Sequence, residues 1–212
     1  MKTITGRWVV GALLFSGLAG CAGSTAKTAQ SGVTPQAAPS TASSPSPVKT
    51  PSHTDADAGL MTGMIGHHAQ AVLIAGWAPS HNASRAIQAL CERIVVGQRD
   101  EINLMQRWLT EWNQPVPSAD ASHDMMPGML TADELKRLDA AQGQDFDRIW
   151  LQSMIKHHQG ALTMIKDLLA SPGAARDDAV FKFVSDMNAD QGIEIERMTG
   201  MLAALPSSAS AQ

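Results

Sequence analysis

Two pairs of adjacent histidines are the side chains of this sequence best suited to binding a metal ion. They stand in two similar stretches, Met64-Ile-Gly-His67-His68 and Met154-Ile-Lys-His157-His158. In a helix, the methionine and the first histidine of each stretch lie on one face, and that face continues an apolar stripe. The second histidine lies about 100° further round the helix and also continues an apolar row. We therefore expect four imidazoles at or near the interior of a helical fold.

A glutamate motif follows each histidine motif along the chain. It reads Gln98-x-x-Glu101-x-x-x-Met105 in the first copy and Gln191-x-x-Glu194-x-x-x-Met198 in the second. Each glutamate continues the apolar stripe of its helix, at a position where a leucine would be ordinary. Burying an ionised carboxylate costs several kcal/mol unless it is paired or bound to a metal, so each glutamate needs a partner. The recurrence indicates an internal repeat in which a histidine helix pairs with a glutamate helix.

Copper is the metal that this set of donor atoms suits best. Imidazole serves both oxidation states of copper, thioether sulfur favours the soft ions Cu(I) and Ag(I), and Cu(II) heads the divalent affinity order. Zinc or iron would not require methionine. On the glutamate helices the candidate contacts are Glu101, Glu194, Met105 and Met198, with the glutamates either binding the metal or orienting the histidines.

A methionine-rich segment between the two halves adds further soft donors. The segment His123-Asp-Met125-Met126-Pro-Gly-Met129 falls in a predicted loop, where core packing explains its methionines less well. We expect it to form a second metal site or a cover over the first.

Packing alone offers a competing interpretation. A single core histidine is more often a hydrogen-bonded structural residue, and methionine is an adaptable filler of helical cores. Cys91 is assigned to packing, because its counterpart in the second half is Val184. Two alternatives to copper binding therefore stay open: an interaction module of the cell envelope with a buried histidine–glutamate network, and a divergent di-metal enzyme.

Proline, glycine and capping residues divide the chain into helices. Thr131-Ala-Asp-Glu134 is a capping-box pattern that opens a short helix, which we expect Gly143 to break. Two hairpins of long helices can bury their apolar stripes only against each other, which predicts an all-α four-helix bundle with a short connecting helix. The expected helices cover residues 57–77, 84–112, 131–141, 145–170 and 175–204.

The N-terminal region reads as an export signal followed by a lipid anchor. Residues 1–20 combine a basic start, an apolar centre and a small-residue cleavage site, and Leu18-Ala-Gly-Cys21 resembles the lipobox in which Cys21 is acylated. We expect a lipidated tether rich in Ala, Ser and Pro over residues 21–54, the helical domain over 55–205 and a disordered tail over 206–212. Ala22 after the cysteine fits transfer to a Gram-negative outer membrane, facing the periplasm. The membrane, bound through the lipid anchor, is therefore one predicted partner.

Charge argues against nucleic acid as a partner. The full chain carries 16 basic and 20 acidic residues, and removal of the signal takes away Lys2 and Arg7, which makes the balance more acidic. The sequence does not distinguish a second copy of the chain from another envelope protein as a further partner.

At these motifs the sequence resembles the bacterial family catalogued as domain of unknown function 305. The similarity runs from about Gly59 to Leu202 and rests on the two His-His motifs, on Met126-Pro-Gly-Met129 and on Gln191-Gly-Ile-Glu-Ile-Glu-Arg-Met. The resemblance implies a ferritin-like four-helix fold, an envelope location and, for some members, periplasmic copper binding that helps cells to resist the metal. Carried over to matching positions, it implies metal contacts at His67, His68, His157, His158, Met64, Met154, Met126 and Met129.

The sequence departs from catalytic members of the ferritin-like group. Their di-iron sites use Glu-x-x-His on two helices. At that spacing Glu101 is followed by Leu104 and Glu194 by Arg197. No nucleophile with an adjacent base, phosphate loop or dinucleotide motif occurs either. We therefore expect a non-catalytic lipoprotein that binds Cu(I), Cu(II) and Ag(I) for buffering, transfer or resistance.

Overall fold

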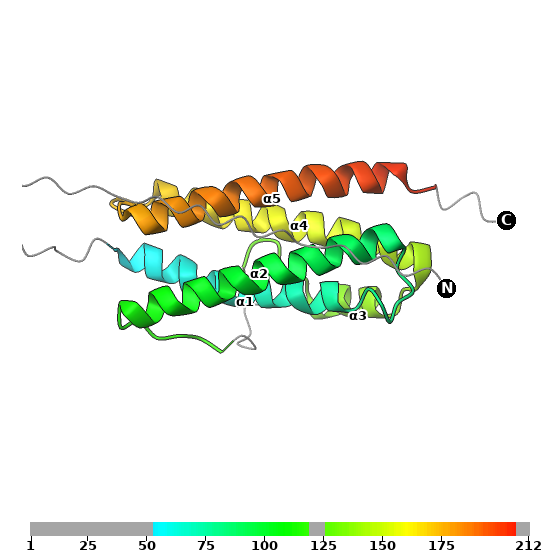
Figure 1. Ribbon diagram of the computed structural model, residues 1–212, viewed down its shortest axis with the longest axis horizontal. Coiled ribbons are helices and arrows are strands. Elements are labelled where there is room, and N and C mark those ends of the chain that lie inside the picture. Colours follow the sequence, from blue (N-terminus) through cyan, green and yellow to red (C-terminus); the bar gives the residue numbers. More distant parts are fainter. Residues whose placement is uncertain (1–52, 119–125, 207–212) are drawn as a thin grey trace, which may run out of the picture. The chain divides into compact units, whose positions relative to one another are not determined.

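The computed structural model describes residues 53–118 and 126–206, and in this part of the chain the regular secondary structure is all helical, with no strand (Figure 1). The expected signal, Cys21 and the tether as far as residue 52, His123 and Met125, and residues 207–212 lie outside it. Within the described residues, none of the helices combines the length and apolarity that a membrane span needs. The helices are α1 (Asp55–Gly76), α2 (Arg85–Glu111), α3 (Ala132–Asp139), α4 (Gly143–Ala170) and α5 (Asp178–Ala204).

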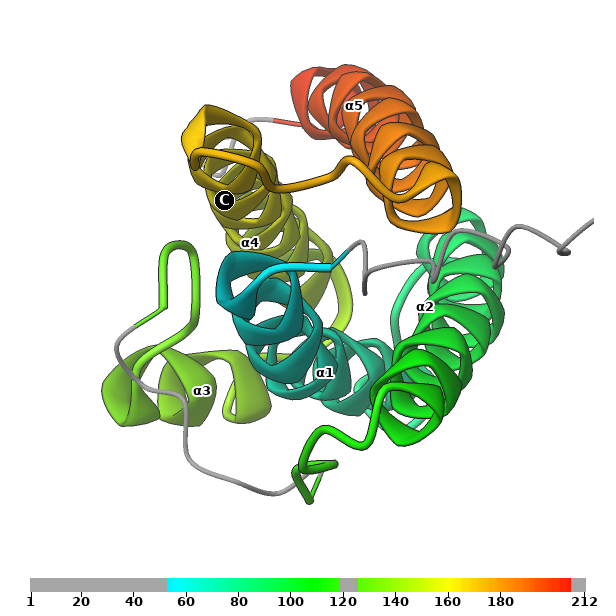
Figure 2. The ribbon, with the colours of Figure 1, turned by 90° about the vertical axis from the view of Figure 1, so that its left-hand side faces the viewer.

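The long helices pack as two hairpins that meet through α1 and α4. Helix α1 packs along α2, α4 packs along α5, and α1 also contacts α4. Viewed along the helices, the four long helices surround a common interior and the short α3 lies outside it, where it contacts α4 (Figure 2). The all-helical prediction is confirmed.

Capping side chains fix where the helices begin. Thr131 caps α3 with the predicted capping box, in which its hydroxyl accepts from the backbone N–H of Glu134 and the Glu134 carboxylate accepts from that of Thr131. A second box joins Thr54 and Asp57, so α1 begins at Asp55 rather than at the predicted residue 57.

Two other predicted boundaries were wrong. Gly143 does not interrupt the helix that precedes α4. It is the first residue of α4 itself, at a φ of 56° that glycine adopts without strain. Its N–H donates to the carbonyl of His81 at 2.8 Å. Helix α5 begins at Asp178 instead of residue 175, because Asp177 caps it by accepting from the N–H groups of Ala179 and Val180.

The core consists of two apolar clusters separated by polar side chains. One cluster contains Ile74, Ile94, Trp150 and Met198, and the other contains Met64, Met105, Ile165 and Val184. On every long helix, the residues between the two clusters are those of the histidine or glutamate motif. We term this set the histidine layer: His67, His68, Gln98, Glu101, His157, His158, Gln191 and Glu194.

Candidate metal centre

Each hairpin contains a hydrogen-bonded histidine–glutamate pair. In the first, His68 Nε2 lies 2.7 Å from Glu101 Oε2, and in the second His158 Nε2 lies 2.6 Å from Glu194 Oε2. Because a carboxylate accepts, each imidazole donates its Nε2–H, and in a neutral ring the Nδ1 then carries a lone pair. The predicted need of each glutamate for a partner is confirmed by these contacts.

The glutamates are less buried than a core position implies. Both histidines are fully buried, but the side chains of Glu101 and Glu194 are 21% and 27% exposed. They lie at a cleft between α2 and α5 instead of inside the core. The prediction of core carboxylates was therefore wrong in degree, since these two helices leave space between them at this level.

The other two histidines meet across the hairpins. The rings of His67 on α1 and His157 on α4 lie with centroids 3.8 Å apart and planes 39° apart. His67 donates from Nε2 to the carbonyl of Pro127 at 3.0 Å. Burial first, and then the charge that a protonated His68 would carry, lowers the pKa of His67 to about 3. Burial, and next His67, holds the pKa of His157 well below its usual value, so both rings are neutral near pH 7.

Several imidazole nitrogens of the histidine layer have no hydrogen-bond partner within the described residues. They are Nδ1 of His67, His68 and His158 and both ring nitrogens of His157. An unsatisfied buried polar atom costs about 1–3 kcal/mol, so such a group in a folded protein requires an explanation. Buried imidazole nitrogens with free lone pairs fit metal binding. A histidine that donates its second nitrogen to a carboxylate or carbonyl is also usual for a metal ligand.

The donor atoms are nevertheless not assembled into a finished site. Over residues 53–118 and 126–206, no three His, Cys, Asp or Glu side chains converge closely enough to hold a metal ion. Binding at the histidine layer therefore requires side-chain rotation or a donor of another type. Methionine sulfur is the other type that the sequence supplies.

The predicted methionines fall into two groups. Met64 and Met105 are fully buried in one apolar cluster, while Met154 and Met198 are fully buried in the other, where core packing is a sufficient explanation for them and their role as metal contacts stays a prediction. Met126 and Met129 belong instead to a loop. The sulfur of Met126 lies over Gly63 of α1, 3.1 Å from the position that a Cβ on this glycine would take.

The segment from Met126 to Met129 forms a tight turn seated on α4. The N–H of Met129 donates to the carbonyl of Met126 at 3.3 Å, and Gly128 has a φ of 81° after Pro127, as in a type II turn. A Cβ on Gly160 of α4 would lie 2.0 Å from the carbonyl oxygen of Pro127. The absence of a side chain at this one position of α4 thus allows the turn to approach and place a carbonyl on His67.

Two glutamines of the layer and one aspartate beside it were assigned no role of their own from the sequence. Gln98 and Gln191 are each 3% exposed, and both amide atoms of Gln98 and the carbonyl oxygen of Gln191 lack partners within the described residues. Asp190 lies at the cleft, where burial and then Glu101 and Glu194 raise its pKa. The sequence did mark the two glutamines, because glutamine recurs in both glutamate motifs. It did not mark Asp190, which directly precedes the second motif and has no acidic counterpart before the first.

Cys91 is not a candidate metal ligand at neutral pH. Its thiol is buried in an apolar cluster, and burial and then Asp147 raise its pKa to about 12. A thiol must lose its proton to bind a metal well, so the assignment of Cys91 to packing agrees with its surroundings.

Comparison with known proteins gives one consistent family. Residues 57–202 match the family described as Domain of unknown function (DUF305). A DUF305 fragment from Deinococcus radiodurans is 28% identical with a TM-score of 0.64, covering 72% of this chain and 99% of that one. A DUF305 protein from Streptomyces coelicolor, described as one expected to be secreted, is 28% identical with a TM-score of 0.63, covering 73% and 94%.

A third similar structure was solved with metal. CopM in its Cu(II)-bound form is 28% identical with a TM-score of 0.58, covering 69% of this chain and 95% of that one. CopM has also been solved in Cu(I)-bound and Ag-bound forms. The comparison with curated proteins gives no match.

The contact at Gly160 predicts an unusually costly Gly→Ala change. We expect Gly160→Ala to lower the free energy of unfolding by about 2–3 kcal/mol, because the new methyl group collides with backbone atoms of the turn. In the control Gly200→Ala, on a part of α5 where nothing lies within 4 Å of the new atom, we expect a gain of about 0.5–1 kcal/mol. Urea unfolding of both metal-free variants measures this, and equal effects would contradict the seated turn.

Acid is expected to destabilise the metal-free protein through His67. Its pKa is about 3 when folded and 6.5 when unfolded, so below pH 6.5 only the unfolded chain takes up the proton. The stability that this group contributes is therefore complete above pH 6.5 and is lost as the pH falls toward 3. From pH 7 to pH 5 we expect a loss of roughly 2 kcal/mol that His67→Gln removes, as measured by urea unfolding. The same pH slope in both proteins would show that His67 is not buried as a neutral ring.

Proposed function

We propose that this chain, which belongs to the DUF305 family, binds copper at its histidine layer, as Cu(I) and Cu(II), and accepts Ag(I) in the same place. The observation that carries the proposal is the set of buried imidazole nitrogens without partners, above all the two of His157. Similarity to CopM, which has been solved with Cu(II), Cu(I) and Ag bound, supports the same metals.

The residues divide into groups with different roles in this proposal. His67 and His157 supply neutral nitrogens between the hairpins, and Met126 and Met129 supply sulfur from the turn beside them. Glu101 and Glu194 orient His68 and His158 through their hydrogen bonds. Copper, when bound, would be a cargo held by nitrogen and sulfur donors. Met64, Met105, Met154 and Met198 fill the core.

We further propose that the protein is an envelope lipoprotein without enzymatic activity. The lipobox at Cys21 and the signal before it support this location. Copper buffering, transfer or resistance then requires only reversible binding, and no residue of the histidine layer has the nucleophile-and-base arrangement of a catalyst. The similarity to an expected secreted protein is consistent with an exported chain.

We also propose that the two hairpins are copies of one unit in a ferritin-like bundle. The pairs His68–Glu101 and His158–Glu194 support this, because each joins the first helix of its hairpin to the second through the same atoms at nearly the same distance.

A structural role for the layer is the second candidate, and the same two pairs favour it. A histidine–glutamate pair that is satisfied without metal can fix the register of two helices, which is a known use of buried polar groups. In that case the layer would only stabilise the fold, and the protein would bind other envelope components through its outer faces.

Replacing His157 separates the two candidates. We expect His157→Gln to reduce copper binding at least tenfold while leaving the helical content unchanged, because this ring has at most a marginal contact with the backbone of His67 for the fold to lose. His81→Gln is the control, since His81 is buried away from the layer and bonded to backbone carbonyls of Trp77 and Asp139. Copper titration followed by circular dichroism tests both. If the wild-type protein binds no copper, the copper proposal fails and the structural role remains.

Replacing methionines tests whether the turn supplies sulfur. We expect Met126→Leu with Met129→Leu to weaken Cu(I) and Ag(I) binding about tenfold and to change Cu(II) affinity little, because leucine keeps the volume and removes only the soft donor. The control pair Met105→Leu with Met198→Leu removes two core sulfurs and should change neither affinity. Competition titrations with each ion give the comparison. Equal losses in both double variants would contradict a special role for the turn.

A further inference from the structure

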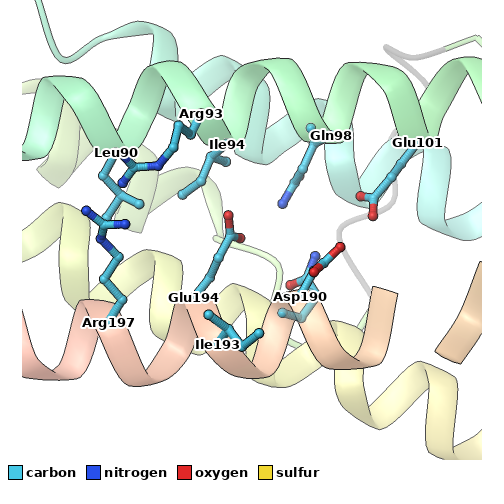
Figure 3. A pocket seen from close by; sticks show the side chains of 11 residues that line it. Leu90, Arg93, Ile94, Gln98, Glu101, Asp190, Ile193, Glu194 and Arg197 are labelled. Carbon is cyan, nitrogen blue, oxygen red and sulfur yellow. The ribbon is translucent and has the colours of Figure 1, made fainter. Parts of the chain in front are cut away.

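A cleft between α2 and α5 opens beside the histidine layer. Its volume is about 250 Å³, and both glutamates of the layer line it together with Asp190 (Figure 3). Glu101 and Glu194 therefore have two contacts each: one with a buried histidine and one with the cleft. The cleft is the place where the layer reaches the surface between the two hairpins.

Two buried glutamines show that the cleft is suited to a polar occupant. Gln98 is 3% exposed, neither of its amide atoms has a partner within the described residues, and its side chain points from α2 into the cleft (Figure 3). The carbonyl oxygen of Gln191, on the facing helix, is also buried and unpartnered. Each such group costs free energy unless something in the cleft satisfies it.

The charged side chains around the cleft favour a cation as its occupant. Three carboxylates, those of Glu101, Asp190 and Glu194, face the same space and repel one another. Arg93 and Arg197 line the other end of the cleft (Figure 3), which leaves the end with Glu101 and Asp190 as the negative part. Carboxylate and amide oxygens are donors that hard divalent ions prefer, in contrast to the nitrogen and sulfur of the proposed copper site.

An ion in this cleft would have to keep most of its water, because the side chains do not close around one point. The carboxylates do not converge into a closed cage, and at about 30 Å³ per water molecule the cleft has room for an ion with about six waters. We propose that the cleft between α2 and α5 binds a hydrated divalent cation through Gln98, Glu101, Asp190 and Glu194, and that it is the path by which such a cation reaches the histidine layer. The second part of this inference rests on the proposed function, whereas the first does not.

Manganese tests the cation site without involving copper. Mn(II) prefers oxygen donors, and its binding to the metal-free protein is measured by water-proton relaxation. We expect Asp190→Asn to weaken Mn(II) binding about 3–10-fold. Glu196→Gln removes the same charge from an exposed position of α5 that does not line the cleft, and should change binding by less than about half. Equal effects of the two changes, or a wild-type protein that does not bind Mn(II), would overturn the cation site.

Filling the cleft without changing charge tests the path. Gly97 lines the cleft on α2, and nothing lies within 4 Å of the position of an added Cβ, so Gly97→Leu puts a side chain into open space and favours the helix. We expect it to slow Cu(II) uptake in stopped-flow measurements about tenfold, while the control Gly200→Leu leaves the rate unchanged. Unchanged uptake in Gly97→Leu would overturn the path.

The two sets of results separate this inference from the proposed function. If Mn(II) binding depends on Asp190 but the wild-type protein takes up no copper, the copper proposal fails and the cation site stands. If copper binds and neither Asp190→Asn nor Gly97→Leu differs from its control, the copper proposal stands and the cleft has neither role.

Discussion

Four imidazole rings are buried in the middle of this helical core, and the rest of the structure is arranged around the cost of placing them there. Apolar clusters lie on both sides of them along every long helix, so the rings have little access to water. Two of them donate to carboxylates that remain partly exposed, which keeps the charge of Glu101 and Glu194 solvated while a buried donor is satisfied. The half-buried position of these glutamates follows from that compromise.

The rings of His67 and His157 have no carboxylate partner, and this difference makes them the proposed nitrogen donors. His67 is held by a backbone carbonyl that reaches it only because the turn sits directly on Gly160, whereas His157 has at most a marginal contact with the backbone of His67. Burial lowers the pKa of both rings, so both are neutral, and each has a nitrogen lone pair without a protein partner. A core that needed only stability would have apolar residues at these positions, since such swaps at buried polar groups are often neutral or stabilising.

The same layer links the interior to the surface. Glu101 and Glu194 connect His68 and His158 to the cleft, so one set of hydrogen bonds both positions the inner rings and defines the negative end of an open space. Hard oxygen donors line the cleft, the softer nitrogen donors lie in the core behind them, and the sulfur donors lie in the turn on α1 and α4. This order suits an ion that exchanges water for protein ligands in steps.

Sequence periodicity determined what is local to each helix. The 3.6-residue pattern placed the four histidines at the interior, the capping box at Thr131 and Glu134 marked the start of α3, and the cost of a buried carboxylate required a partner for each glutamate. Patterns of this kind depend only on neighbours along one helix. The lipobox at Cys21 is equally local and stays a prediction.

Tertiary structure alone decided which side chains meet. His68 pairs with Glu101 inside its hairpin, whereas His67 meets His157 across the hairpins, because that choice depends on how α1 and α4 are rotated against each other. The importance of Gly160 depends on a turn about 30 residues earlier in the chain that lies over it. The opening between α2 and α5, which leaves the glutamates half-exposed beside Asp190, likewise follows from helix spacing, which no residue pattern within one helix encodes.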